Sequence, residues 1–319
     1  MYFPYIRGRQ FDLLALRELV GKNLLHEQII PVIEPVNLSS TLISTIAQFN
    51  TMKHTLAVIR NPEVGSFLEE FGSLDGAIGN ASKKQDFIAS IQQPTVLQAL
   101  IMNNETPRIL SELAVLGIQK QDLVVVLSDR DMLKPYQNLF ASAAPRYTVI
   151  PDEGTFRRNI ATNKVLLTDC FQRQERNADY SHKEDEPFSD TYQYYADEGY
   201  VGFGDYSIIG DDYNASGFAP YAVAIHLVYP AKDNSLRVRH FVSDSNEDIS
   251  NPAQKFYQAL RKLVRWYEEE RAVPLTMGLK TLLNHFKDET YPGLGSLKKL
   301  TIMHHLELMG KLLDGGLFV

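Results

Sequence analysis

The stretch Val201-Gly-Phe-Gly-Asp-Tyr-Ser-Ile-Ile-Gly210 sets the pattern that the rest of the chain repeats. A short apolar segment runs up to Asp205 and there breaks into a turn rich in glycine and aspartate. Upstream, apolar β-branched runs end in the same way at a charged or amide residue, and most are followed by a segment with helical periodicity. This repetition predicts a β/α protein whose polar residues gather at one end of its strands.

About eight such runs occur, the number at which a parallel sheet closes into a barrel filled by its own side chains. The clearest is Leu123-Val-Val-Val-Leu127, whose continuous apolar character is typical of a strand covered on both faces. A strand starting at Tyr221 could displace the eighth one and leave the barrel irregular or open. The expected strands are 2–6, 29–33, 55–59, 95–101, 123–127, 147–150, 164–168 and one that ends at Asp205.

We therefore expect an α/β fold, a TIM-like (β/α)8 barrel, as a single domain over residues 1–319. Three additions follow or interrupt the repeat. Residues 170–200 are polar and tyrosine-rich and are expected to form a loop insertion. Residues 211–250 are expected to hold a β-hairpin, and residues 251–319 show helical periodicity.

Composition narrows the class of protein. The net charge of −7 makes nucleic acid an unlikely partner for the chain as a whole, although a local basic groove is compatible with it. The single cysteine, Cys170, cannot form an intramolecular disulfide, which fits a reducing compartment. No signal peptide and no apolar run of membrane-spanning length is recognisable, so we expect a cytoplasmic protein without a membrane partner.

If the strands form a barrel, their polar ends converge on one rim, where barrel enzymes carry their sites. Acids crowded together cannot all stay ionised without cost, so such a cluster binds a divalent cation, pairs with arginines, or raises the pKa of one member. Each alternative allows chemistry. The residues at these ends are Arg7, Arg9, Glu34, Arg60, Asn103, Asp129, Asp152, Asp169 and Asp205.

Within this set, we assign catalysis to Glu34, Asp169 and Asp205, which are also the expected ligands of a Mg²⁺ or Mn²⁺ ion. Arginine suits an anionic substrate because it grips phosphate or carboxylate oxygens in a bidentate way. The expected substrate-binding residues are Arg7, Arg9, Arg60, Asn103, Asp129 and His226.

The acids of this set also have a structural explanation, because parallel strands run into polar loops and aspartate is a common helix N-cap. Asp129 and Asp152 precede helical patterns and are readily explained as helix N-caps. Glu34 is less easily explained in this way, and Asp205 is the strongest single candidate for a functional acid. His226 and His240 lie on the two expected hairpin strands and could face each other there.

Three phrases of the sequence resemble the beta-protein family of phages and bacteria. They are Tyr2-Phe-Pro-Tyr-Ile-Arg-Gly-Arg-Gln10, Ile30-Pro-Val-Ile-Glu-Pro35, and Gly202-Phe-Gly-Asp-Tyr-Ser207 continuing through Ala222-Val-Ala-Ile-His226. The resemblance implies a phage or mobile-element setting, with a role in defence against phages as one form of it. It carries no catalytic role onto any residue.

Two functions are compatible with these patterns. The first is an enzyme, a metal-assisted hydrolase or phosphoesterase, that acts on a small anionic substrate at the rim. The alternative is a non-catalytic scaffold that holds a partner protein through its C-terminal helices and the tyrosines of the 170–200 segment. Those tyrosines are Tyr180, Tyr192, Tyr194, Tyr195 and Tyr200.

Overall fold

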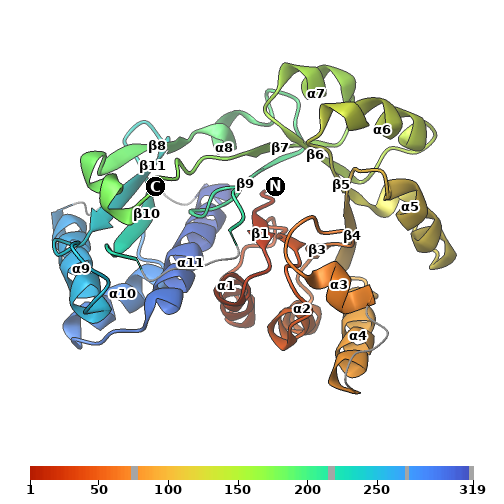
Figure 1. Ribbon diagram of the computed structural model, residues 1–319. Coiled ribbons are helices and arrows are strands. Elements are labelled where there is room, and N and C mark those ends of the chain that lie inside the picture. Colours follow the sequence, from red (N-terminus) through yellow and green to blue (C-terminus); the bar gives the residue numbers. More distant parts are fainter. Residues whose placement is uncertain (73–77, 215–219, 270–272, 316–319) are drawn as a thin grey trace. The chain divides into compact units, whose positions relative to one another are not determined.

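The computed structural model describes residues 1–72, 78–214, 220–269 and 273–315 and shows an α/β protein (Figure 1). The chain divides into two compact units, each with a sheet of its own. Unit 1 comprises Met1–Leu13, Glu27–Thr168 and Gln193–Asp205, and unit 2 comprises Leu14–His26, Asp169–Tyr192 and Tyr206–Val319.

Unit 1 holds an eight-stranded parallel sheet that is nearly closed into a barrel, which confirms the expected TIM-like architecture. The strands follow one another in the order of the chain, apart from β8, which belongs to the other sheet. They are β1 (Tyr5–Arg7), β2 (Val32–Glu34), β3 (Leu56–Ile59), β4 (Val96–Ile101), β5 (Val124–Val126), β6 (Tyr147–Pro151), β7 (Lys164–Thr168) and β9 (Gly202–Asp205).

The two ends of the sheet meet where β9 contacts the segment before β1. The N–H of Phe3 donates to the carbonyl of Phe203 at 2.7 Å, and Tyr2 forms a parallel bridge with Phe203. A Cβ at Gly204 would lie 2.1 Å from the carbonyl oxygen of Phe3, so this close approach requires glycine. The expected eighth strand is thus confirmed in its place, and no strand starting at Tyr221 displaces it.

Helices follow most strands of unit 1, as the periodicity predicts. The side chain of Ser39 caps α2, because it accepts from the N–H of Leu42 in the first turn. The long segment after β3 forms two helices, and residues 73–77 between them lie outside the described part. The helices up to β7 are α1 (Gln10–Gly21), α2 (Ser40–Met52), α3 (Phe67–Gly72), α4 (Ile78–Ile91), α5 (Thr106–Val115), α6 (Leu133–Phe140) and α7 (Gly154–Asn159), with 3-10 turns η1 (Lys120–Asp122) and η2 (Arg130–Met132).

Unit 2 contains a three-stranded antiparallel sheet in the order β10 (Ala224–Pro230), β11 (Leu236–Val242) and β8 (Asp185–Ser189). The first two strands form the expected hairpin. Its helices include α9 (Pro252–Glu269), α10 (Met277–Lys287) and α11 (Leu294–Leu313), which confirms the helical prediction for the described residues beyond 251. Parts of the two predicted additions, residues 215–219, 270–272 and 316–319, lie outside the described residues.

The 170–200 segment differs from its prediction as a loop. It contains the 3-10 turn η3 (Asn177–His182), the strand β8 and the short helix α8 (Thr191–Tyr194). Asp-Glu-Pro-Phe-Ser has no apolar alternation over its charged first half, and β8 forms because β11 offers it an antiparallel partner. Among the described residues, no helix is long and apolar enough to cross a membrane.

Candidate functional site

Glu34 ends β2 and is completely buried. Its Oε2 accepts from the hydroxyl of Tyr5 at 2.7 Å and from the guanidinium of Arg7, and its Oε1 accepts from the N–H of Glu63 at 2.8 Å. Tyr5 and Arg7 point the same way because they are two residues apart on β1, whose Arg7 is in register with Glu34. The carboxylate therefore ties β1, β2 and the segment after β3 together and orients Arg7.

The side chain of Arg7 is 14% exposed, so it lies at the edge of this buried cluster. Its guanidinium carbon lies 5.2 Å from the centre of the Tyr5 ring. The N–H of Arg9 donates to the carbonyl of Arg7 at 2.6 Å in the turn that leads into α1. The structure thus brings Arg7 together with Glu34, and it places Arg9 beside them along the chain.

Glu63 connects this cluster to the end of β4. Its N–H is bound by Glu34, while its exposed side chain accepts from the amide of Asn103 at 3.3 Å. Asn103 also accepts from the N–H of Glu105 through its Oδ1 at 3.0 Å, which fixes the orientation of its amide. Four of the predicted rim residues, Arg7, Glu34, Arg60 and Asn103, therefore stand at the ends of neighbouring strands β1 to β4.

A pocket of about 190 Å³ opens where β3 and β4 end. Three phenylalanines of α3 and α4 form one wall, with ring centres 5.2 Å apart for Phe67 and Phe87 and 5.6 Å apart for Phe67 and Phe71. The loops after β3 and β4 supply its polar groups, and α5 closes the remaining side. The lining residues are Arg60, Asn61, Pro62, Phe67, Leu68, Phe71, Phe87, Asn103, Glu105, Arg108, Ile109, Glu112, Leu113 and Leu116.

Arg60 is one of two cations that line this pocket; the other, Arg108, pairs with Glu105 and Glu112. Its guanidinium donates to Oε1 of Gln98 at 3.0 Å, and Gln98 is held in that orientation because its amide nitrogen donates to the carbonyl of Ile91 at 2.6 Å. Within the described residues Arg60 forms no ion pair. Burial lowers the pKa of Arg60, and the charge of Glu112 offsets part of that effect. A half-buried guanidinium with one neutral partner has unused capacity for anionic oxygens.

Asp129 and Asp152 have structural roles in unit 1. Asp129 is an exposed N-cap whose side chain accepts from the N–H of Asp131 at 2.9 Å, as its position predicts. Asp152 is not the cap of α7, since Glu153 occupies that position. Instead, Asp152 lies 3.5 Å from Arg157 in a surface ion pair.

Asp205, the strongest candidate from the sequence, is 3% exposed and accepts from the hydroxyl of Tyr2 at 2.7 Å. Side chains alternate along β9, so Asp205 shares a face with Phe203, whose ring packs on that of Tyr2. The Tyr2–Asp205 bond therefore reinforces the closure of the barrel between β9 and the chain's first residues.

Asp169 belongs to unit 2. Its two oxygens accept from the N–H groups of Phe171 and Asp211, each at 3.1 Å. Burial raises the pKa of Asp169, and the neighbouring carboxylate of Asp211 adds to the rise while the two N–H bonds oppose it. This arrangement holds together the turns that follow β7 and β9.

His226 also belongs to unit 2 and faces His240 across the hairpin, as expected. Their Nδ1 atoms are 2.7 Å apart, and Nε2 of His240 lies 3.2 Å from Glu186. Because a carboxylate only accepts, His240 donates through Nε2, and its Nδ1 then accepts from His226. Burial, together with the proximity of His240, lowers the pKa of His226 to about 3. The three side chains form one chain of hydrogen bonds across the sheet, in which Glu186 and His240 are buried and His226 is half-buried.

Among the described residues, no group of three or more histidine, cysteine, aspartate or glutamate side chains is placed to hold a metal ion. This finding gives no support to the expected cation shared by Glu34, Asp169 and Asp205, which stays a prediction. No protein-family model matches the chain, and a search of the curated proteins finds no match.

The other residues that shape the pocket around Arg60 were, apart from Asn103, not predicted from the sequence. Phe67 and Phe71 are one helical turn apart, and this spacing was the available signal for an aromatic wall. Glu63 follows Arg60-Asn-Pro62 directly and could have been included as an acid near a strand end. Tyr5 is an ordinary strand residue of β1, and nothing in the sequence around it indicates its hydrogen bond to Glu34.

Proposed function

We propose that the protein is an enzyme that binds a small anionic substrate in the pocket at the ends of β3 and β4. The observation that carries the proposal is the half-buried guanidinium of Arg60, which has a neutral hydrogen-bond partner and an aromatic wall beside it. An anionic group that replaces water around this guanidinium gains a charge-assisted bond in a partly desolvated site.

The pocket also indicates what the rest of the substrate is like. Phe67 and Phe87 are almost completely buried, while Leu68 at the same pocket is 50% exposed and could cover a bound apolar group. A pocket of about 190 Å³ accommodates a single ring or a short carbon chain beside the anionic group. We therefore favour a phosphate ester or carboxylate with a compact apolar part.

Glu63 and Asn103 supply the polar groups for chemistry. The carboxylate of Glu63 is exposed and bound by the amide of Asn103, whose residue lines the pocket. A positioned carboxylate of this kind can transfer a proton to or from a bound substrate. Glu34, with its oxygens engaged by Tyr5, Arg7 and Glu63, acts as a positioning residue for the loop that carries Glu63.

Binding is tested by isothermal titration with phenyl phosphate. We expect saturable binding that Arg60→Ala weakens at least tenfold and that Arg130→Ala leaves unchanged. Arg130 is the control because it is 68% exposed, pairs with Glu153 and lies outside the pocket. Equal affinity of the Arg60→Ala variant and the original protein would contradict the proposal.

Turnover is tested separately, with a set of phosphate monoesters and carboxylate esters. A Glu63→Gln variant should lower kcat by about 100-fold with little change in KM, because the amide cannot accept a proton. Thermal unfolding with Mg²⁺ or Mn²⁺ examines the cation, to which the proposal assigns no residue. A stabilising shift that Asp205→Ala removes would restore the metal-assisted form of the reaction.

The structure also bears on the scaffold alternative. Of the five tyrosines expected to face a partner, Tyr180 and Tyr200 are buried, and Tyr192 and Tyr195 are half-buried and hydrogen-bonded to Asn234 and Met1. Only Tyr194 is largely exposed, at 51%. Four of the five tyrosines are therefore packed against other parts of the protein, so we favour the enzyme over a tyrosine-lined docking surface.

A further inference from the structure

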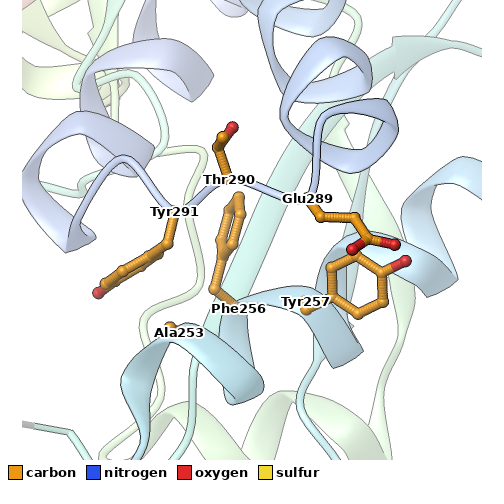
Figure 2. Close-up of a pocket in the computed structure, with 6 residues that line it drawn as sticks. All are labelled: Ala253, Phe256, Tyr257, Glu289, Thr290 and Tyr291. Carbon is orange, nitrogen blue, oxygen red and sulfur yellow. The ribbon is translucent and has the colours of Figure 1, made fainter.

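Unit 2 carries a second pocket, of about 310 Å³, between the first turns of α9 and the loop that follows α10 (Figure 2). The helix contributes Ala253, Phe256 and Tyr257, which share a face because they are three and four residues apart. The loop contributes Glu289, Thr290 and Tyr291. Three aromatic side chains and one carboxylate thus line the space together with Ala253 and Thr290, and Phe256 is itself almost completely buried at its base.

The pocket is held in shape by contacts within and behind its lining. The ring of Tyr257 stacks on Phe286, with centres 5.2 Å apart and planes at 13°, and the ring of Phe256 packs against Tyr291 at 5.5 Å. In the loop, Oγ1 of Thr290 lies 2.7 Å from Nδ1 of His285. The rings and the loop are therefore largely placed before any ligand arrives, which lowers the entropic cost of binding.

Glu289 gives the pocket its charge. Its side chain extends towards the ring of Tyr257 in Figure 2, and within the described residues its carboxylate forms no ion pair. Its backbone has a φ of 50°, a conformation that glutamate adopts rarely. The loop therefore holds an unneutralised acid at the edge of an aromatic pocket.

We propose that this pocket binds an alkylated ammonium group, as found in choline-like small molecules. The negative faces of aromatic rings attract a cation, and a nearby carboxylate adds to that attraction. An alkylated ammonium fits better than a primary ammonium or a metal ion. It has few or no N–H groups that bind water, so its desolvation on binding costs less. Its methyl groups also fill an apolar space.

The test uses nuclear magnetic resonance titrations of the full chain with choline, its uncharged carbon isostere 3,3-dimethyl-1-butanol, and glycine betaine. We expect choline to shift the signals of the pocket residues in a saturable way, and the isostere to bind about fivefold more weakly or not at all. Betaine should also bind more weakly than choline, because its carboxylate meets Glu289. A peptide bearing trimethyllysine distinguishes a protein-borne cation from a free one.

Two variants separate charge from shape. Glu289→Gln keeps the size of the side chain and should weaken choline binding about fivefold, and Tyr257→Leu should weaken it to a similar extent. Glu268→Gln is the matched control, because Glu268 is an exposed acid on the same helix away from the pocket. Equal binding of choline and its isostere, or tighter binding of the peptide than of choline, would overturn the proposal.

Discussion

The two sheets of this protein place their charged side chains differently. In unit 1, strands such as β3 and β5 are apolar and buried along their whole length, and charges such as Arg7, Glu34 and Arg60 stand where strands end. In unit 2, the antiparallel sheet carries charges within its strands, where Glu186 meets His240 and Asp185 meets Arg237. A sheet covered on both faces pushes polar groups to its ends, where they become available to a ligand.

The largest effect should come from removing the buried carboxylate at the end of β2. Glu34→Leu would leave the Tyr5 hydroxyl, the Arg7 guanidinium and a backbone N–H without their acceptor, at a cost of roughly 3–5 kcal/mol in the free energy of unfolding. Urea unfolding followed by circular dichroism measures it. Glu153→Leu, which breaks a surface ion pair with Arg130, should cost less than about 1 kcal/mol. Equal losses of stability in the two variants would contradict the stabilising role of the buried Glu34 carboxylate.

The second-largest effect is a loss of stability of unit 2 at acid pH. His304 is fully buried between Thr276 and the carbonyl of Val228, and burial lowers its pKa to about 4. The unfolded chain takes up a proton near pH 6.5 while the folded chain does not, so stability is complete above that pH and falls between about 6.5 and 4. The loss for this residue is roughly 3 kcal/mol, and His226 acts in the same direction.

The single tryptophan makes this prediction measurable in one unit. Trp266 lies on α9 and packs against Tyr229 and Phe241, so its fluorescence reports on unit 2. Urea unfolding followed by this fluorescence should show a lower midpoint at pH 4.5 than at pH 7. A midpoint that does not change with pH would mean that protonation of His304 and His226 does not destabilise the folded state.

The two units also differ in how much of their structure is predictable from the sequence. The parallel strands of unit 1 were predictable because each needs a continuous apolar run, as in Leu123–Leu127, and the polar ends follow from the same requirement. The face on which a polar end lies was not predictable: Asp205 turns towards Tyr2, while Glu34 turns towards Tyr5 and Arg7. In strands this short, the register with the neighbouring strands decides on which face the terminal side chain lies.

In unit 2, the hairpin was recognisable from its alternating residues, whereas β8 was not. Asp185 and Glu186 read as surface residues, yet Glu186 is 1% exposed because His240 and Lys183 bind it. The pocket around Arg60 was missed for a similar reason, since its wall combines α3 with Phe87 of α4, sixteen or more residues further along the chain. Such tertiary contacts leave little trace in local periodicity.

The smallest effect should come from the ion-pair network on β8. Asp185 accepts from the Tyr229 hydroxyl at 2.6 Å and from Arg237 at 2.5 Å, and its side chain is 23% exposed. Asp185→Asn should cost about 1–2 kcal/mol by urea unfolding. It should also lower the pKa of Tyr229, which burial and Asp185 raise to about 12, as ultraviolet absorbance would show. Asp190→Asn, an exposed acid just beyond β8, is the control that should leave both quantities unchanged.

Anion binding by Arg60, at the end of β3, is the central proposal for unit 1, and a double-mutant cycle tests it directly. The affinities of the original protein and of Arg60→Ala are measured for phenyl phosphate and for phenol, which lacks the anionic group. If Arg60 binds the phosphate, its loss weakens phenyl phosphate at least tenfold and phenol little, a coupling of about 1.4 kcal/mol or more. Equal weakening of both ligands would mean that Arg60 only shapes the pocket, and the proposed anionic substrate would be contradicted.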